Sequence, residues 1–250
     1  MFYTRIPCPT WVDHSEDLLN KATKYFPFMG WIVGGAAAII FIAFSQILPL
    51  SIAIFLSTAF GVWMTGAFHE DGFADVCDGF GGGWTPDKIL SIMKDSRVGA
   101  YGAIGIGLLM GLKIMALLEL ARIDWLSTIY ALISAHALSR LTATTIILTD
   151  EYARENEDSK AKPVAKKMSN SAFLQAAFWG IGPLSIWCIF EKNGLLLGVF
   201  IPLILLKIYL SDYFKKWING YTGDCLGATQ QLAEVVCYLS FLIALRYHGL

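Results

Sequence analysis

About seven stretches of the 250-residue chain are apolar enough and long enough to cross a membrane. A helix needs about 20 mostly apolar residues to span roughly 30 Å of hydrocarbon. Because backbone amides find no water in that layer, such stretches fold as helices. The sequence therefore predicts an all-α, polytopic integral-membrane helix bundle with about seven transmembrane helices. The spans are expected at about 28–48, 50–68, 99–120, 125–149, 172–190, 194–211 and 224–245.

The composition agrees with a membrane protein, since 56% of the residues are hydrophobic and only 16% are charged. Soluble domains usually carry about 25% charged residues. The net charge of −1 says nothing about partners, and no basic patch in the sequence suggests a nucleic-acid partner, so the lipid bilayer is the expected surrounding. No long linker divides the chain, so residues 1–250 are expected to form one catalytic domain. Its polar parts are an N-terminal segment 1–27, an acidic motif 69–98, a loop 150–171 and a C-terminal motif 219–235.

The distribution of Lys and Arg between the predicted spans indicates how the chain is oriented. With the N-terminus placed inside, thirteen Lys and Arg residues lie in the inside segments and three in the outside segments. Cytoplasmic loops of membrane proteins carry such an excess. The count predicts a multi-pass protein of the cell (inner) membrane whose acidic motif, loop 150–171 and segment 212–223 face the cytoplasm, where nucleotides are found.

The acidic motif HEDGFADVCDGFGGG, residues 69–83, carries Asp71, Asp75 and Asp78 at spacing i, i+4, i+7. On a helix these side chains fall within an arc of about 60°. Three carboxylates so close repel one another unless a cation lies between them, and magnesium binds carboxylates while leaving positions for substrate phosphates. We therefore predict that these three aspartates bind Mg²⁺ and act in catalysis. The alternative is a solvated acidic loop at the membrane surface.

Cationic side chains follow in MKDSRVGAYG, residues 93–102, and in SAHALSR, residues 134–140. Lys94 and Arg97 are expected to hold substrate phosphates, with Asp95 orienting one of them, because Arg forks onto phosphate oxygens and Lys supplies a point charge. Arg140 lies inside a predicted span, four residues after His136, and an arginine there is a candidate phosphate contact. The alternatives are a positive anchor for the next span, a snorkelling arginine and a packing role for the histidine.

The C-terminal motif NGYTGDCLGATQQLAEV, residues 219–235, opens the last predicted span. A helix start offers free N–H groups to an anion. We expect Thr222, Asp224 and Glu234 to form a second wall of the substrate site, opposite the acidic cluster. Asp224 could instead be a plain cap or charge at the helix start. Gln231 and Glu234 lie within the span and need polar partners there.

The proton acceptor of the reaction is open between His69, an aspartate of the cluster and water. The unperturbed pKa of histidine, about 6.5, suits a base at neutral pH. On a helix that already includes it, His69 would face away from Asp71. It can therefore serve as the base only if the helix starts at or after Glu70.

Together and in this order, the motifs resemble the adenosylcobinamide-GDP ribazoletransferase (cobalamin synthase) family. The resemblance covers nearly the whole chain. It rests on FYTRIPCP (2–9), FPFMG (26–30), TGAFHEDGFADVCDGFGGG (65–83), KDSRVGAYG (94–102), Ser139 with Arg140, and GYTGDCLGATQQLAE (220–234). Two departures stand out. Glu70 occupies a position where the family commonly has a leucine-like residue, and ENEDSKAKPVAKK (155–167) replaces the family's glycine-containing sequence after Tyr152, Ala153 and Arg154.

The resemblance implies a reaction and its partners. A ribose hydroxyl of α-ribazole, or of its 5′-phosphate, attacks the diphosphate of adenosylcobinamide-GDP, GMP leaves, and the nucleotide loop of cobalamin is closed with magnesium required. Composition and spacing alone name no corrinoid. A homo-oligomer is also expected.

Two other functions share some of these features. A CDP-alcohol phosphatidyltransferase also joins a nucleotide diphosphate to an alcohol at a membrane aspartate cluster, but here Ala74 is followed by Asp75 rather than Arg, and Asp78 comes only three residues later. An ion-coupled transporter would use intramembrane residues such as His136, Arg140 and Glu234. Most polar residues of this chain instead cluster at the predicted cytoplasmic edge.

Overall fold

A computed structural model describes residues 4–5, 16–153 and 168–247. Within these ranges the chain is helical, and its single β contact is an isolated bridge between Tyr152 and Tyr221. The helices are α1 (Glu16–Ala22), η1 (Thr23–Tyr25), α2 (Phe26–Ser45), α3 (Leu50–Thr65), α4 (Phe68–Gly82), α5 (Pro86–Ile92), α6 (Ala100–Ile123), α7 (Trp125–Thr149), α8 (Asn170–Glu191), η2 (Gly194–Val199), α9 (Phe200–Ile218) and α10 (Gly223–Arg246).

Six helical stretches in the described part of the chain are long and apolar enough to cross a membrane, and the number is 7 if the bent pair of α3 and α4 is counted as one span. The prediction of a polytopic bundle of about seven spans is confirmed. The expected span 50–68 differs from the structure, because α3 ends at Thr65 and the chain turns by 87° into α4. Gly66 and Ala67, both with positive φ, form that corner. Glycine adopts this left-handed conformation readily and commonly ends helices in it.

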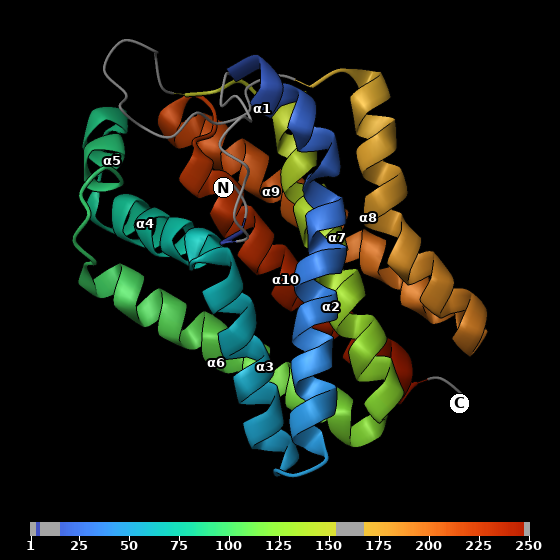
Figure 1. Ribbon diagram of the computed structural model, residues 1–250. Coiled ribbons are helices and arrows are strands. Elements are labelled where there is room, and N and C mark those ends of the chain that lie inside the picture. The colour runs from blue at the N-terminus through green and yellow to red at the C-terminus, as the bar shows by residue number, and fades with distance from the viewer. Residues whose placement is uncertain (1–3, 6–15, 154–167, 248–250) are drawn as a thin grey trace.

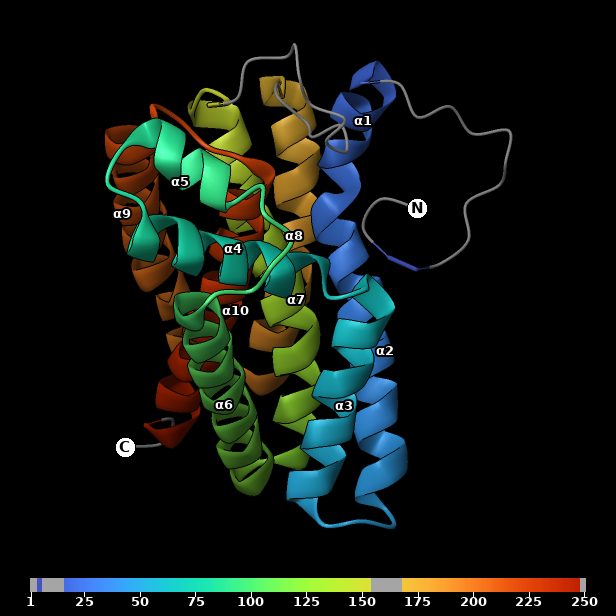
Figure 2. The same cartoon turned by 90° about the vertical axis from the view of Figure 1, so that its left-hand side faces the viewer.

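Helix α4, which carries the acidic motif, lies across the bundle while α3 and α6 run upright beside it (Figure 2). Its sequence FHEDGFADVCDGFGG holds one Glu and three Asp in 15 residues. A helix with that many carboxylates would be costly if it ran through hydrocarbon along the membrane normal. The bend after α3 therefore places the acidic residues near one end of the bundle.

Helix α7 forms the centre of the bundle, packed between α2, α8 and α10 (Figure 1). In its apolar window 78% of the residues are buried, against 33% for the window that includes α2. Helices α2 and α7 approach closely at Gly30, where an added Cβ would fall on the backbone carbonyl of His136. Side chains of Phe41, Trp187 and Phe241 belong to one apolar cluster of the core.

The polar motifs gather at one end of the molecule. Both views place α5, the end of α7 and the start of α8 at that end, and the turn between α2 and α3 at the other (Figures 1 and 2). Next to the bridge, Tyr221 N donates to Glu151 O at 3.0 Å and Ala153 N donates to Tyr221 O at 2.9 Å. These bonds tie the segment after α7 to the segment before α10. Arg154 and the sequence 155–167 lie outside the described residues, as do 1–3 and 6–15.

The close approach at Gly30 gives a test of the packing between α2 and α7. We expect Gly30→Ala to lower stability by about 1–3 kcal/mol, because the methyl group meets backbone that must move. Gly35→Ala in the same helix is the matched control, since no atom from another part of the described chain lies within 4 Å of its added Cβ. It should leave stability unchanged or raise it by up to about 1 kcal/mol through helix propensity. Thermal unfolding of the purified protein measures both, and equal effects would contradict this packing.

A candidate active site beside a buried polar network

The acidic helix α4 crosses the start of α10 at Gly72. A Cβ added at Gly72 would lie 3.0 Å from Asp224 Cα, so the two backbones are in close contact there. Asp71 is exposed and Asp75 is half-buried. The structure thus brings together the acidic motif and the C-terminal motif, which are 150 residues apart in sequence, at one end of the bundle.

Asp78 caps helix α6. Its carboxylate accepts a hydrogen bond from Gly99 N at 2.7 Å and another from Gly102 N at 2.8 Å. A carboxylate at a helix start satisfies N–H groups that have no partner within the helix and favours the positive end of the helix dipole. Gly102 leaves room for this carboxylate, because an added Cβ would overlap it.

The capping role of Asp78 differs from the predicted set of three metal ligands. Within the described residues, no three His, Cys, Asp or Glu side chains are arranged to hold a metal ion together. The spacing placed the three aspartates on one arc of the helix, but the side chain of Asp78 bonds to the backbone of the α5–α6 connection. Asp71 is exposed and Asp75 half-buried on α4, and their binding of Mg²⁺ stays a prediction.

The loop between α5 and α6 carries the predicted phosphate-binding cations. Arg97 pairs with Asp95, with Arg97 Nη2 at 2.6 Å from Asp95 Oδ2 and Arg97 Nε at 3.0 Å from Asp95 Oδ1. These hydrogen bonds lower the pKa of Asp95 and raise that of Arg97. The Arg97 side chain is 88% exposed, and Lys94 is exposed as well. The bond from Gly99 to Asp78 fastens this loop to the acidic helix.

Thr222 is the N-cap of α10. Its side chain is fully buried, and its Oγ1 accepts a hydrogen bond from Cys225 N at 3.3 Å. Asp224, half-buried, lies in the first turn of the same helix. Thr222 therefore shapes the helix start, and Asp224 is the side chain of this motif that is partly accessible beside α4.

His69 does not meet the condition set for a general base. Helix α4 starts at Phe68, so His69 lies within its first turn and points away from Asp71. The imidazole is 2% exposed and stacks on the ring of Phe26, with the centroids 5.8 Å apart. His69 therefore belongs to the interior of the bundle in this structure.

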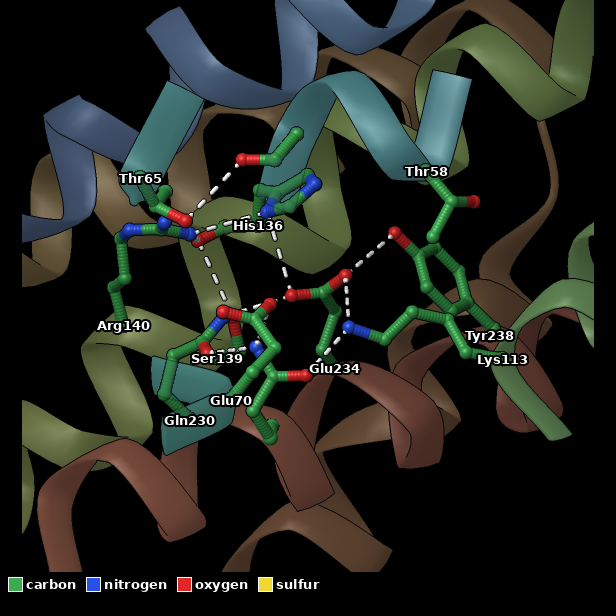
Figure 3. Close-up of polar contacts among 12 residues, drawn as sticks. Thr58, Thr65, Glu70, Lys113, His136, Ser139, Arg140, Gln230, Glu234 and Tyr238 are labelled. Carbon is green, nitrogen blue, oxygen red and sulfur yellow. Dashed lines mark hydrogen bonds and ion pairs between the residues drawn. The ribbon is translucent and has the colours of Figure 1, made fainter. Parts of the chain in front are cut away.

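A buried network of polar side chains surrounds Glu234 beneath α4 (Figure 3). One carboxylate oxygen lies 3.1 Å from Lys113 Nζ and accepts a hydrogen bond from Tyr238 OH at 3.1 Å. The other accepts a bond from Gln230 Nε2 at 2.7 Å and lies 3.3 Å from His136 Nδ1. The expectation that Glu234 finds polar partners within its span is confirmed. Its cationic partner, Lys113 of α6, had no role predicted from the sequence.

Gln231 links Lys113 to Glu70, and the chemistry of its neighbours fixes its orientation. Lys113 Nζ donates to Gln231 Oε1 at 2.6 Å, and Gln231 Nε2 donates to Glu70 Oε1 at 2.8 Å. Lysine can only donate and an ionised carboxylate can only accept, so the amide cannot turn over. Because Glu70 is held inward, Asp71, about 100° further around the helix, faces outward.

Arg140 and Glu234 lie away from the surface where substrate was expected to contact them. Arg140 is 1% exposed, its Nη1 donates to His136 O at 2.8 Å, and its guanidinium carbon lies 5.6 Å from the Phe26 ring centre. Glu234 follows Asp224 by ten residues on α10, a rise of about 15 Å. Of the residues predicted for the second wall, those at the start of α10 therefore lie beside α4, and Glu234 belongs to the buried network.

The fold and site define a polytopic membrane protein with a polar surface at one end of its bundle, supported by charged residues inside. The sequence profile of the cobalamin-5-phosphate synthase family matches residues 1–242, and the chain belongs to this family.

Relatives from bacteria match this chain over nearly their whole length. An adenosylcobinamide-GDP ribazoletransferase of Shewanella frigidimarina (strain NCIMB 400) is 46% identical over 243 residues, which cover 96% of this chain and 91% of the relative. One of Leptospira interrogans serogroup Icterohaemorrhagiae serovar copenhageni (strain Fiocruz L1-130) is 42% identical over 247 residues, covering 98% and 93%. No solved structure shows a significant match.

The orientation of the Gln231 amide can be tested by exchanging the side chains of Gln231 and Glu70. Gln231→Glu should lower stability by about 1–3 kcal/mol, because it sets a carboxylate against Glu70 in a buried position. Glu70→Gln combined with Gln231→Glu restores donors opposite acceptors and should recover most of the lost stability. Thermal unfolding of the two single variants and the double variant measures this coupling. Additive losses would show that the two side chains do not interact as described.

Proposed function

We propose that the chain is an adenosylcobinamide-GDP ribazoletransferase. It joins adenosylcobinamide-GDP to α-ribazole, or to α-ribazole 5′-phosphate, and releases GMP in the last steps of cobalamin nucleotide loop assembly. The names of the relatives at 42–46% identity support this reaction. The structural observation that carries it is the attachment of the α5–α6 loop, with its exposed Lys94 and Arg97, to the acidic helix α4 through the hydrogen bonds of Asp78. This set of charges suits transfer at a diphosphate.

Asp71 and Asp75 are proposed to hold Mg²⁺. Their fit rests on donor chemistry: both are hard oxygen ligands one helical turn apart, and magnesium is bound in proteins by one or two carboxylates together with substrate phosphates and water. When bound, magnesium would polarise the diphosphate and stabilise charge on the departing GMP phosphate. Asp78 caps the start of α6, and through this contact it keeps the preceding loop, with Lys94 and Arg97, close to α4.

The remaining contacts follow from where each side chain lies. Arg97, held by Asp95, and Lys94 would bind phosphate oxygens of the diphosphate. Asp224 would accept hydrogen bonds from a guanine edge or a ribose hydroxyl, or complete the metal site. Thr222 positions Asp224 by capping α10. Direct contact of Arg140 or Glu234 with substrate would need the helices around the buried network to part.

The attacking ribose hydroxyl must lose a proton during the reaction. Because His69 faces the interior, we assign this proton to a carboxylate of α4 or to water. A carboxylate can accept the proton only if it lies within hydrogen-bond reach of the substrate hydroxyl, and this condition applies before any condition on its pKa.

The site is proposed to face the cytoplasm from the inner membrane, where its nucleotide substrate is found. The excess of Lys and Arg at the end of the bundle that carries α5 supports this orientation. A homo-oligomer also stays a proposal. The family shown by the sequence does not favour the phosphatidyltransferase or transporter alternatives.

The reaction is tested by release of radiolabelled GMP from adenosylcobinamide-GDP in the presence of α-ribazole and Mg²⁺. We expect Asp75→Asn to lower turnover at least about a hundredfold, the loss of one major electrostatic stabiliser. Asp87→Asn, an exposed aspartate of the neighbouring helix α5, is the matched control and should keep normal activity. Near-normal turnover of Asp75→Asn with unchanged magnesium dependence would remove this residue from the metal site.

The orientation is tested with single cysteines at opposite ends of the bundle. Trp84 is 81% exposed beside α5, and Ile47 is 74% exposed in the turn between α2 and α3. In intact cells, a membrane-impermeant thiol reagent should label Ile47→Cys and spare Trp84→Cys, with the unchanged chain as the background for its native cysteines. Lysed cells should show both labelled. The reverse pattern in intact cells would place the site outside.

A further inference from the structure

A small cavity lies within the buried polar network. Its volume is ≈ 20 Å³, and its walls come from six helices, α2, α3, α4, α6, α7 and α10. A cavity needs about 10–15 Å³ of this kind to hold one water molecule. The space is therefore large enough to hold a water molecule.

Three polar atoms of residues that line this cavity have no hydrogen-bond partner among the described residues. They are His69 Nε2, Glu70 Oε2 and Arg140 Nε. Their residues are 2%, 9% and 1% exposed. Buried polar atoms are nearly always bonded to protein or to ordered water. Three residues with such atoms line the same cavity, which points to a shared ligand there.

The charges around the cavity restrict the chemistry of that ligand. Lys113 and Glu234 form a direct pair at 3.1 Å, which leaves one cation, Arg140, and one anion, Glu70, without a direct ionic partner in the described part of the chain. An anion in the cavity would meet the Glu70 carboxylate, and a metal cation would meet the Arg140 guanidinium. A neutral molecule that both accepts and donates hydrogen bonds fits both walls.

We propose that the cavity is a binding site for one ordered water molecule that bridges α4 and α7. The water accepts a hydrogen bond from Arg140 Nε–H and donates one to Glu70 Oε2. Its remaining hydrogen or lone pair serves His69 Nε2, according to the tautomer of the ring. With Gln231 on Oε1 and the water on Oε2, both oxygens of Glu70 are held, and the start of α4 is tied to α7 as well as to α10. This site does not depend on the reaction proposed above.

A structure of the full chain in lipid nanodiscs, at a resolution that shows ordered water, tests the site directly. We expect one density peak within about 3.2 Å of both Arg140 Nε and Glu70 Oε2. Three results would overturn the proposal: no peak where other buried waters are seen, a direct bond between Arg140 and Glu70, or a peak that scatters as a halide or metal ion.

Radiolytic hydroxyl footprinting provides an independent measurement, because radicals formed from a trapped water oxidise the side chains beside it. Tyr238 and Trp187 are both 0% exposed, but only Tyr238 lines the cavity. We expect oxidation of Tyr238 and none of Trp187, although tryptophan reacts at least as readily. Equal protection of both residues would contradict the bound water.

A variant pair then assigns the labelling to this cavity. Glu70→Leu removes the acceptor at similar size and should abolish oxidation of Tyr238. Ser134→Ala is the control, since the Ser134 hydroxyl also has no partner among the described residues, is fully buried and does not line the cavity. Its labelling should equal that of the unchanged protein. If Glu70→Leu does not fold, the comparison of Tyr238 with Trp187 in the unchanged protein still decides.

Discussion

The ion pair between Lys113 and Glu234 is the interaction on which the interior of this bundle depends. A lysine at the centre of a membrane helix costs about 2.5–3.5 kcal/mol on insertion scales, and an unpaired buried carboxylate is also costly. Here each compensates the other at 3.1 Å, while Gln231, Gln230, His136 and Tyr238 occupy the remaining hydrogen-bonding positions. Removing either partner alone would leave a buried charge unmatched, so α6 and α10 are constrained to remain paired at this level.

The same network decides how the surface site is presented. Lys113 donates a hydrogen bond to Gln231, and Gln231 donates one to Glu70. Because these bonds hold Glu70 towards the interior, Asp71 faces outward from α4. Towards the other end of that helix, Asp78 fixes the loop that carries Arg97 by capping α6. The arrangement of charges at this surface thus depends on contacts that α4 makes with α6 and α10.

Apolar length predicted the spans well, because hydrocarbon thickness leaves few alternatives, and the specific motifs indicated the family. The details of the site depended on facts that spacing does not contain. The arc of three aspartates could not show that Asp78 would bond to Gly99 and Gly102, since that depends on the path of the intervening loop. Whether His69 could act as the general base depended on the residue at which α4 begins. Lys113 did leave a signal: it lies near the middle of a long apolar helix, too far from either end for easy snorkelling, and so required an acidic partner.

The corner between α3 and α4 also bears on how the chain enters the membrane during synthesis. Helix α3 has 16 residues, fewer than the roughly 20 that a helix needs to cross the hydrocarbon alone, and the acidic sequence after it resists transfer into lipid. Only four residues, 46–49, separate it from the long apolar helix α2. We therefore expect the insertion machinery to release α2 and α3 into the bilayer together as a helical hairpin. The acidic segment should stay at the water interface until α6 and α10 are inserted and pack against it.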